Sequence, residues 1–340
     1  MRSSSTPALG DEPPLVDLTQ PLPVKSKRTE RLRKKLQKKS PAKLVDARGF
    51  GDLPYELTMA IFQFLRPQDL LTLCCVSKGF RTLILAEEHY ICNRIIEIRY
   101  PILARCLQRP ALTENLDEPV RQALQSPLRP ETQIIYQHVQ QPDMALVCTC
   151  MTCLLRWNSL CLALDFAHWQ DDLDTGKPLP IIPRGTRPAW NRDLLARNAA
   201  TVRKSLTSPL WYIRILEIHL GAIIRSVRRH GQNKGNQRRR FVMTEEDARN
   251  ETDVFLESRG PQTVDFPFSR DNYYMLEAYL PNRSWSADRD RWIYLIGNGH
   301  DDDIRSVLQW EAFFKKRAER RALEKAEREL QELTLLVKST

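Results

Sequence analysis

The most regular hydrophobic pattern in the chain lies between residues 53 and 84. In its first part, apolar side chains recur at three- and four-residue spacing, at Leu57, Ile61, Phe64 and Leu65. This spacing predicts an amphipathic helix over about 53–65. Proline lacks an amide proton and disfavours helical geometry at the residue before it, so Arg66-Pro67 is expected to end this helix.

Two more short helices follow the proline. Asp69 falls in the first turn of the second helix, where a carboxylate suits the helix dipole, and Ser77 can cap the third. Their apolar positions are Leu70, Leu73 and Val76, then Phe80, Leu83 and Ile84. Helices shorter than about 12 residues are marginal in water and depend on tertiary contacts. The three helices offer more apolar surface than they can hide from water, so part of it is expected to meet another surface.

The order of motifs in this segment resembles an F-box, as found in substrate receptors of SCF-type ubiquitin ligases, including those of filamentous fungi. The motifs are Leu53-Pro54, Asp69-Leu70 after the proline break, and Val76-Ser77-Lys78 followed by Phe80-Arg81. The resemblance implies that a Skp-family adaptor, and through it a cullin, binds this segment. The expected adaptor contacts are Leu53, Pro54, Leu57, Ile61, Leu65, Leu70, Leu73, Val76 and Phe80. The segment departs from the family pattern at Cys74-Cys75 and in having Phe80 where many members have tryptophan.

The remaining chain predicts a mainly α fold, in which an irregular helical domain follows the three-helix F-box. Helical spacing favours helices over about 87–100, 191–206 and 209–229, and another from Thr244 to near Arg259. His300 and the three aspartates after it look like a metal motif. They also precede apolar residues at helical spacing, so they are interpreted more simply as the start of a long C-terminal helix. The predicted organisation is a disordered basic tail (1–48), the F-box and an extending helix (49–107), a connector (108–130), a helical partner domain (131–314) and a charged helix (315–340).

The formal net charge of +10 comes largely from the predicted tail, because residues 25–43 hold ten Lys or Arg against the single Glu30. This run is consistent with nuclear import, with nucleic-acid contact or with a solvated charge run. A second basic segment contains Arg228, Arg229, Arg238, Arg239 and Arg240. Guanidinium groups grip phosphate well, so these five are candidates for binding an acidic or phosphorylated client; a solvated insertion is the alternative.

Cys148, Cys150 and Cys153 are the weak candidates for a structural zinc site, with Cys161 nearby and His138 or His168 as a fourth ligand. A strong zinc signature has two paired cysteine steps, whereas this segment has one, Cys150-x-x-Cys153. Cys161 also follows the helical apolar spacing of its neighbours. Buried thiols are therefore the preferred interpretation, and we expect no metal and no cofactor.

The sequence contains no glycine-rich phosphate loop, no G-x-S-x-G and no H-E-x-x-H motif, so we expect a non-catalytic protein. It also lacks a 20–50-residue repeat, a secretory signal pattern and an apolar run long enough to span a bilayer. The expected function is that of an F-box substrate receptor in the nucleus or cytoplasm, which links an unknown client protein to the ligase. The alternative is a nucleic-acid or chromatin protein that uses the basic tail and loop.

Overall fold

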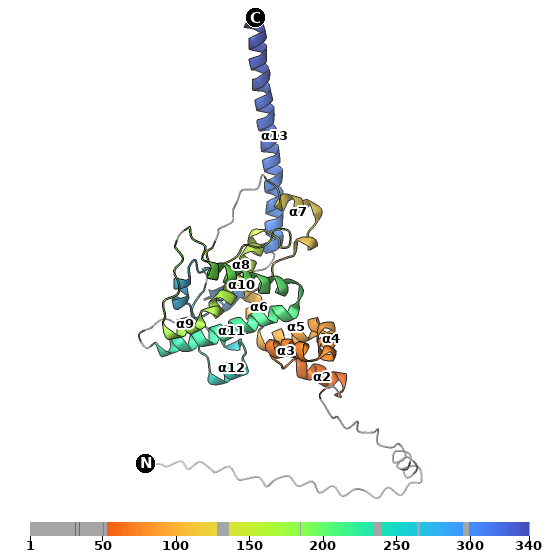
Figure 1. Cartoon of the computed structure of the whole chain (residues 1–340), viewed down its shortest axis with the longest axis vertical. Coiled ribbons are helices and arrows are strands. Elements are labelled where there is room, and N and C mark those ends of the chain that lie inside the picture. The colour runs from red at the N-terminus through yellow and green to blue at the C-terminus, as the bar shows by residue number, and fades with distance from the viewer. Residues whose placement is uncertain are drawn as a thin grey trace, which may run out of the picture. The chain divides into compact units, whose positions relative to one another are not determined.

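The computed structural model describes residues 31, 34, 50, 53–127, 136–183, 185–233, 235, 240–263, 266–294 and 299–339, with side chains up to Gln331. The chain divides into two compact units, residues 1–58 and 59–340, and each is described by itself. The predicted basic tail lies outside the described residues except for Arg31 and Lys34. The described residues form a mainly α structure, as predicted, and its α-helices are labelled in Figure 1.

The α-helices are α2 (Tyr55–Phe62), α3 (Pro67–Val76), α4 (Lys78–Ala86), α5 (Glu88–Arg99), α6 (Leu103–Cys106), α7 (Glu118–Leu124), α8 (Met151–His168), α9 (Gln170–Thr175), α10 (Ala189–Thr207), α11 (Pro209–Gln232), α12 (Glu245–Asn250) and α13 (Gly299–Ser339). Three short 3₁₀ helices, η2 (Thr113–Asn115), η3 (Val254–Glu257) and η4 (Arg270–Met275), lie between them. The strands β1 (Arg283–Ser286) and β2 (Arg291–Tyr294) pair antiparallel, with Trp285 opposite Trp292. The sequence analysis did not predict this hairpin.

Local signals explain the succession of short helices near the N-terminus. Helix α2 ends at Phe62 and is shorter than the predicted 53–65, because Gln63 and Phe64 form a turn. Pro67 occupies the first turn of α3, where its missing amide proton costs nothing. The hydroxyl of Ser77 accepts a hydrogen bond from the Phe80 amide, so this residue caps α4 as predicted.

The core is built around three long helices, α8, α10 and α11, which pack against one another (Figure 1). Helix α8 is buried over most of its circumference and carries the fully buried Trp157 and Phe166. Helix α11 begins at Ser208, whose hydroxyl accepts a hydrogen bond from the Trp211 amide, and Pro209 follows in the first turn. On this helix His219 is completely buried, and its Nε2 lies 2.7 Å from the Tyr279 carbonyl oxygen, as expected of a core histidine.

The predicted helix from Thr244 to near Arg259 is too long. Thr244 and Asp247 do form a capping box, but α12 ends at Asn250 because Glu251 adopts a left-handed backbone conformation with φ of 52°. The chain then turns back, and the carboxylate of Asp253 accepts hydrogen bonds from the amides of Ile102 (2.9 Å) and Leu103 (2.7 Å). This contact joins the segment after α12 to the start of α6.

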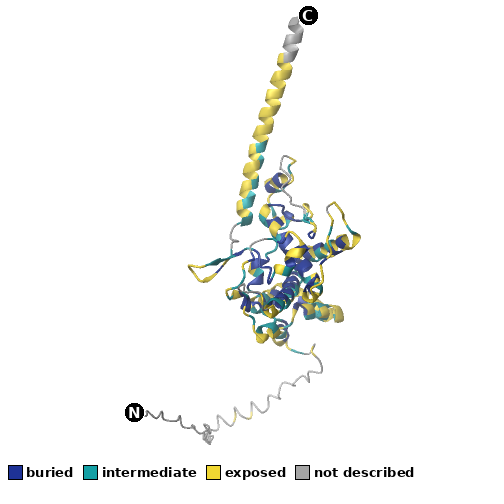
Figure 2. Cartoon of the chain, turned by 90° about the vertical axis from the view of Figure 1, so that its left-hand side faces the viewer, coloured by how far each residue is buried: buried dark blue, intermediate teal, exposed yellow. Residues whose placement is uncertain are grey.

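The long helix α13 starts on the core and then leaves it. Its first turns contact α7 and α8, and Ile304 and Val307 pack against a small apolar cluster there. Figure 2 shows that most of the rest of the helix is exposed. Two acidic residues, Asp301 and Asp302, lie in its first turn, which agrees with the predicted helix start. No described helix is long and apolar enough to cross a membrane.

Candidate functional site

Helices α3, α4 and α5 form a short-helix unit that is fixed to the core through α11. The backbone N–H of Gln68, at the start of α3, donates a hydrogen bond to the Glu217 carboxylate of α11 (3.0 Å). A second contact has its carboxylate on the short-helix unit. The Glu88 carboxylate of α5 accepts hydrogen bonds from the Ser208 hydroxyl and from the backbone N–H of Leu210 (2.8 Å) at the start of α11. Each carboxylate thus satisfies amides that a helix N-terminus leaves unpaired.

The predicted adaptor contacts differ widely in how much surface they present. Val76, in α3, is 77% exposed, and Leu57, in α2, is 53% exposed. Pro54 is also exposed, while the half-buried members of the set are Leu53, Ile61, Leu65, Leu73 and Phe80. Leu70 has no exposed surface and belongs to the core. We therefore leave it out of the proposed contact set, since a fully buried side chain cannot touch a partner.

The half-buried members of the predicted contact set also pack against the interior of the protein. Phe80 packs edge-on against Phe62, with ring centroids 6.2 Å apart, and Leu65 and Leu73 contact the core. Within residues 50–92 the structure adds five large exposed apolar side chains that the sequence analysis did not include among the contacts: Phe50, Tyr55, Phe64, Leu85 and Tyr90. Their exposure could not be seen in the sequence, because helical spacing identifies an apolar face without showing which part of it the core covers.

These observations define a class of protein: a helical body that carries a short-helix unit with exposed apolar positions suited to docking. Residues 50–92 match the family model described as F-box-like, so the chain carries an F-box-like domain over α2, α3, α4 and the start of α5. F-box domains are typically non-catalytic protein-interaction domains. The chain matches no curated protein and no solved structure.

Two described arginines of the second basic segment, Arg228 and Arg240, have polar partners within the chain. Arg228 forms an ion pair with Glu245 (2.8 Å), and Arg240 donates hydrogen bonds to the carbonyl oxygens of His230 and Gly231 at the end of α11. Burial lowers the pKa of Arg229, which is half-buried. Arg238 and Arg239 lie outside the described residues. Arg228 and Arg240 are therefore engaged within the chain, and phosphate binding by this segment stays a prediction.

A recess of about 810 Å³ lies beside the end of α11. Its lining is mixed, with the rings of Tyr274 and Trp285 beside the polar side chains of His230, Arg259 and Glu277. Burial raises the pKa of Glu277 to about 7, although its carboxylate accepts a hydrogen bond from the Phe241 amide (2.8 Å). Aromatic surface with a few polar groups is typical of ligand sites, so this recess is a candidate place for a client segment.

The three candidate zinc cysteines do come together, but the fourth partner differs from both predicted histidines. Cys148, Cys150 and Cys153 lie with His300, and their potential ligand atoms are all within 4.8 Å of one another. The predicted alternatives lie elsewhere: His138 packs against Phe266 and Tyr273, and His168 against Trp169. Cys161 is buried in the core, as its helical spacing predicted. His300 is both part of the predicted helix start and the residue that completes this group.

Proposed function

We propose that this protein is an F-box substrate receptor that binds a Skp-family adaptor and, through it, a cullin of an SCF-type ubiquitin ligase. The observation that carries the proposal is the F-box-like match at residues 50–92, together with the exposed apolar side chains in it. Exposed apolar residues that gather in one patch commonly mark a protein-protein contact. The similarity to F-box proteins of filamentous fungi is an expectation from the sequence.

In this function the chain brings the client close to the subunits that transfer ubiquitin, and it performs no chemical step itself. The adaptor holds the F-box-like domain, the helical body holds the client, and other subunits transfer ubiquitin to the client. Fixing two reactants near each other raises their effective concentration, so a receptor needs a firm connection between its two binding surfaces. The carboxylates of Glu88 and Glu217 provide such a connection, because they tie α3 and α5 to α11.

We place the client on the body, with the recess beside His230 and Trp285 as the candidate site. We place the protein in the nucleus or cytoplasm, because the basic run at residues 25–43 is typical of an import signal. The nucleic-acid alternative is less favoured, since Arg228 and Arg240 are engaged within the chain.

The test is a quantitative binding measurement between the purified chain and a Skp-family adaptor. Val76→Asp and Leu57→Asp each put a charge on an exposed apolar position of the F-box-like domain. A charge buried at an interface core costs more than 1 kcal/mol, so we expect each variant to weaken binding by about tenfold or more. Val242→Asp is the matched control, because Val242 is 72% exposed and lies outside the domain. It should bind as tightly as the unmodified chain.

A second variant, Leu53→Ala/Pro54→Ala, tests the motif from which the F-box resemblance begins. Circular dichroism on every variant separates lost binding from lost folding, and the exposed positions make misfolding improbable for Val76→Asp. Absence of binding by the intact chain, or equal binding by the Val76 and Val242 variants, would rule out the receptor function at this surface.

A further inference from the structure

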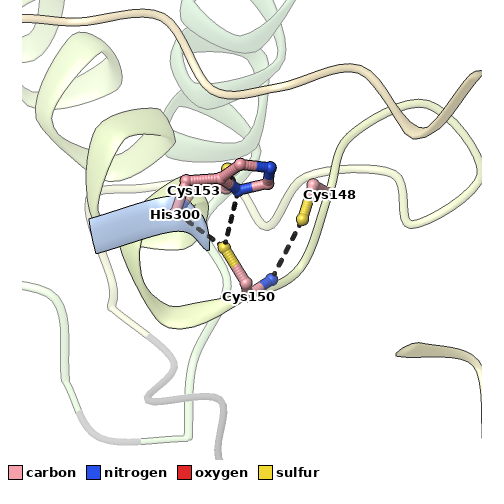
Figure 3. A group of neighbouring side chains, drawn as sticks. All are labelled: Cys148, Cys150, Cys153 and His300. Atoms are coloured by element: carbon pink, nitrogen blue, oxygen red, sulfur yellow. Dashed lines mark hydrogen bonds between the residues drawn. The ribbon is translucent and has the colours of Figure 1, made fainter. Parts of the chain in front are cut away.

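Four side chains from two distant parts of the sequence converge at the start of α8. Cys148 and Cys150 precede the helix, Cys153 lies in its first turn, and His300 lies in the first turn of α13, 147 residues beyond Cys153. The imidazole Nδ1 lies 3.4 Å from the sulfur of Cys150 and 3.3 Å from that of Cys153. Figure 3 shows the imidazole facing these two sulfurs, with Cys148 completing the group.

These distances match the edges of a tetrahedral metal site. Zinc–sulfur bonds of about 2.3 Å and zinc–nitrogen bonds of about 2.0 Å place ligand sulfur and nitrogen atoms about 3.5 Å apart, and two sulfurs about 3.8 Å apart. The sulfur–nitrogen distances here are 3.4 and 3.3 Å, and no pair of ligand atoms exceeds 4.8 Å. Adjustments of about 1 Å or less would therefore bring all four atoms to one ion.

Backbone N–H groups point at all three sulfur atoms. Each sulfur accepts a backbone N–H: that of Cys148 from the Cys150 amide (3.5 Å), that of Cys150 from the Cys153 amide (3.4 Å), and that of Cys153 from the Ala111 amide (3.4 Å). Hydrogen bonds of this kind orient thiolate ligands and stabilise their charge. Three thiolates, one neutral imidazole and a divalent cation carry a net charge of −1, which the adjacent N-termini of α8 and α13 also favour.

The cluster lies where α7, α8 and the start of α13 meet. The three cysteines are buried in a small apolar cluster with Val120 and Leu124 of α7, and Ile304 and Val307 of α13 pack against it. A further polar contact joins the same two helices: the backbone N–H of Thr152 in α8 donates a hydrogen bond to the Asp303 carboxylate of α13 (2.6 Å). A core of this size stabilises little by apolar burial alone, which is the usual situation in which small units depend on a metal.

We propose that Cys148, Cys150, Cys153 and His300 bind one zinc ion, which fastens the start of α13 to the start of α8. Three thiolates and one imidazole are a typical closed donor set for structural zinc, because all four coordination positions are filled by protein and none remains for a substrate. The site is therefore structural and not catalytic. It is independent of the proposed ligase function, because none of its ligands lies within residues 50–92.

The first measurement is the metal content of the intact chain, purified without chelators after expression with zinc. We expect about one zinc per chain by mass spectrometry of the metal. X-ray absorption at the zinc edge should fit three sulfurs at about 2.3 Å and one nitrogen at about 2.0 Å. Replacement of the zinc by cobalt(II) should produce the intense visible absorption of a tetrahedral cobalt thiolate site.

Matched variants assign the ligands. Cys153→Ser and His300→Ala should each lower zinc affinity by at least about tenfold. Cys161→Ala and His168→Ala are the controls, because both residues lie on the same helix, α8, outside the cluster, and both variants should retain the metal. His300→Cys should restore binding with a four-sulfur spectrum. This rescue also shows that metal loss in His300→Ala is not caused by general misfolding.

A structural role predicts a local effect of metal removal. Chelation should increase amide hydrogen exchange in α7, at the start of α8 and in the first turns of α13, while α10 and α11 stay protected. The proposal is overturned if the folded chain contains less than about a tenth of a zinc per chain and takes up none on titration. It is also overturned if two of the three cysteines form a disulfide in the purified protein, or if His300→Ala binds zinc as tightly as His168→Ala.

Discussion

A buried ion pair provides the most direct quantitative test of the core. The Arg270 guanidinium donates two hydrogen bonds to the Asp165 carboxylate, Nε to Oδ2 at 2.9 Å and Nη2 to Oδ1 at 2.8 Å, and the Tyr273 hydroxyl donates a third at 2.7 Å. The side chains of the ion pair are 5% and 0% exposed. The guanidinium also lies over the rings of Trp169 and Trp190, at 5.1 and 5.5 Å. The contact joins α8 to η4 across 105 residues of sequence.

We expect Arg270→Met to lower the free energy of unfolding by about 3–5 kcal/mol at neutral pH, because it leaves the Asp165 carboxylate buried without a counter-charge. Methionine has a similar length and keeps apolar contact with the tryptophans, so the loss reflects the charge more than the volume. The double variant Asp165→Leu/Arg270→Met removes both charges and should recover most of the loss. Tyr273→Phe removes one hydrogen bond to a charged group and should cost about 1.5–3 kcal/mol.

The measurement is urea unfolding, followed by tryptophan fluorescence and circular dichroism, with the midpoint and slope compared among the variants. A cost below about 1 kcal/mol for Arg270→Met, or a double variant that is as unstable as the sum of its parts, would refute this reasoning.

Two further predictions concern a buried carboxylate and a glycine. Burial raises the pKa of Asp253 to about 7. Between about pH 4 and pH 7 the folded state therefore holds a proton that the unfolded state has released. The free energy of unfolding falls as the pH rises through this range. Relative to Asp253→Asn, the unmodified chain should therefore lose about 2–3 kcal/mol between pH 5 and pH 8 in urea unfolding; a constant difference would contradict this. A Cβ atom at Gly260 would lie 2.3 Å from the buried ring of Phe241, so Gly260→Ala should cost about 1–3 kcal/mol. A Cβ atom at Gly221, within α11, would meet open space, so Gly221→Ala should instead stabilise the chain. Equal effects of the two substitutions would be inconsistent with the packing.

The sequence predicted the features that depend on nearby residues. Helical spacing located most of the helices, and the caps at Ser77 and Thr244 are present as expected, because a cap involves residues three positions apart. Helix ends were less predictable. Helix α12 stops where Glu251 takes a left-handed backbone conformation, which a glutamate in the sequence does not indicate. The strands β1 and β2 were missed because each has four residues, too few for alternation to stand out.

The same holds for the candidate sites: residues close together in the sequence could be predicted, and contacts between residues far apart in the sequence could not. The F-box motifs are contiguous in sequence, so a match of 43 positions, residues 50–92, could be anticipated from order alone. His300 could not, because nothing in its surroundings indicates that it meets cysteines 147 residues earlier. The partners of the basic segment show the same limit. Its charges are visible in the sequence, whereas the partners that engage them, such as Glu245 for Arg228, are known only from the fold.

Helix α11 connects helices α3 and α5 to the helix that carries Cys153. It receives α3 and α5 through Glu217 and Glu88, and its long apolar face packs against α8, whose first turn carries Cys153. An F-box-like unit with only its own short helices would turn freely relative to a client, and proximity would then do little for transfer. Attachment to a 24-residue buried helix removes that freedom. The zinc ion would extend the same rigid connection to α13, so metal removal should change how α13 is held while leaving adaptor affinity unchanged.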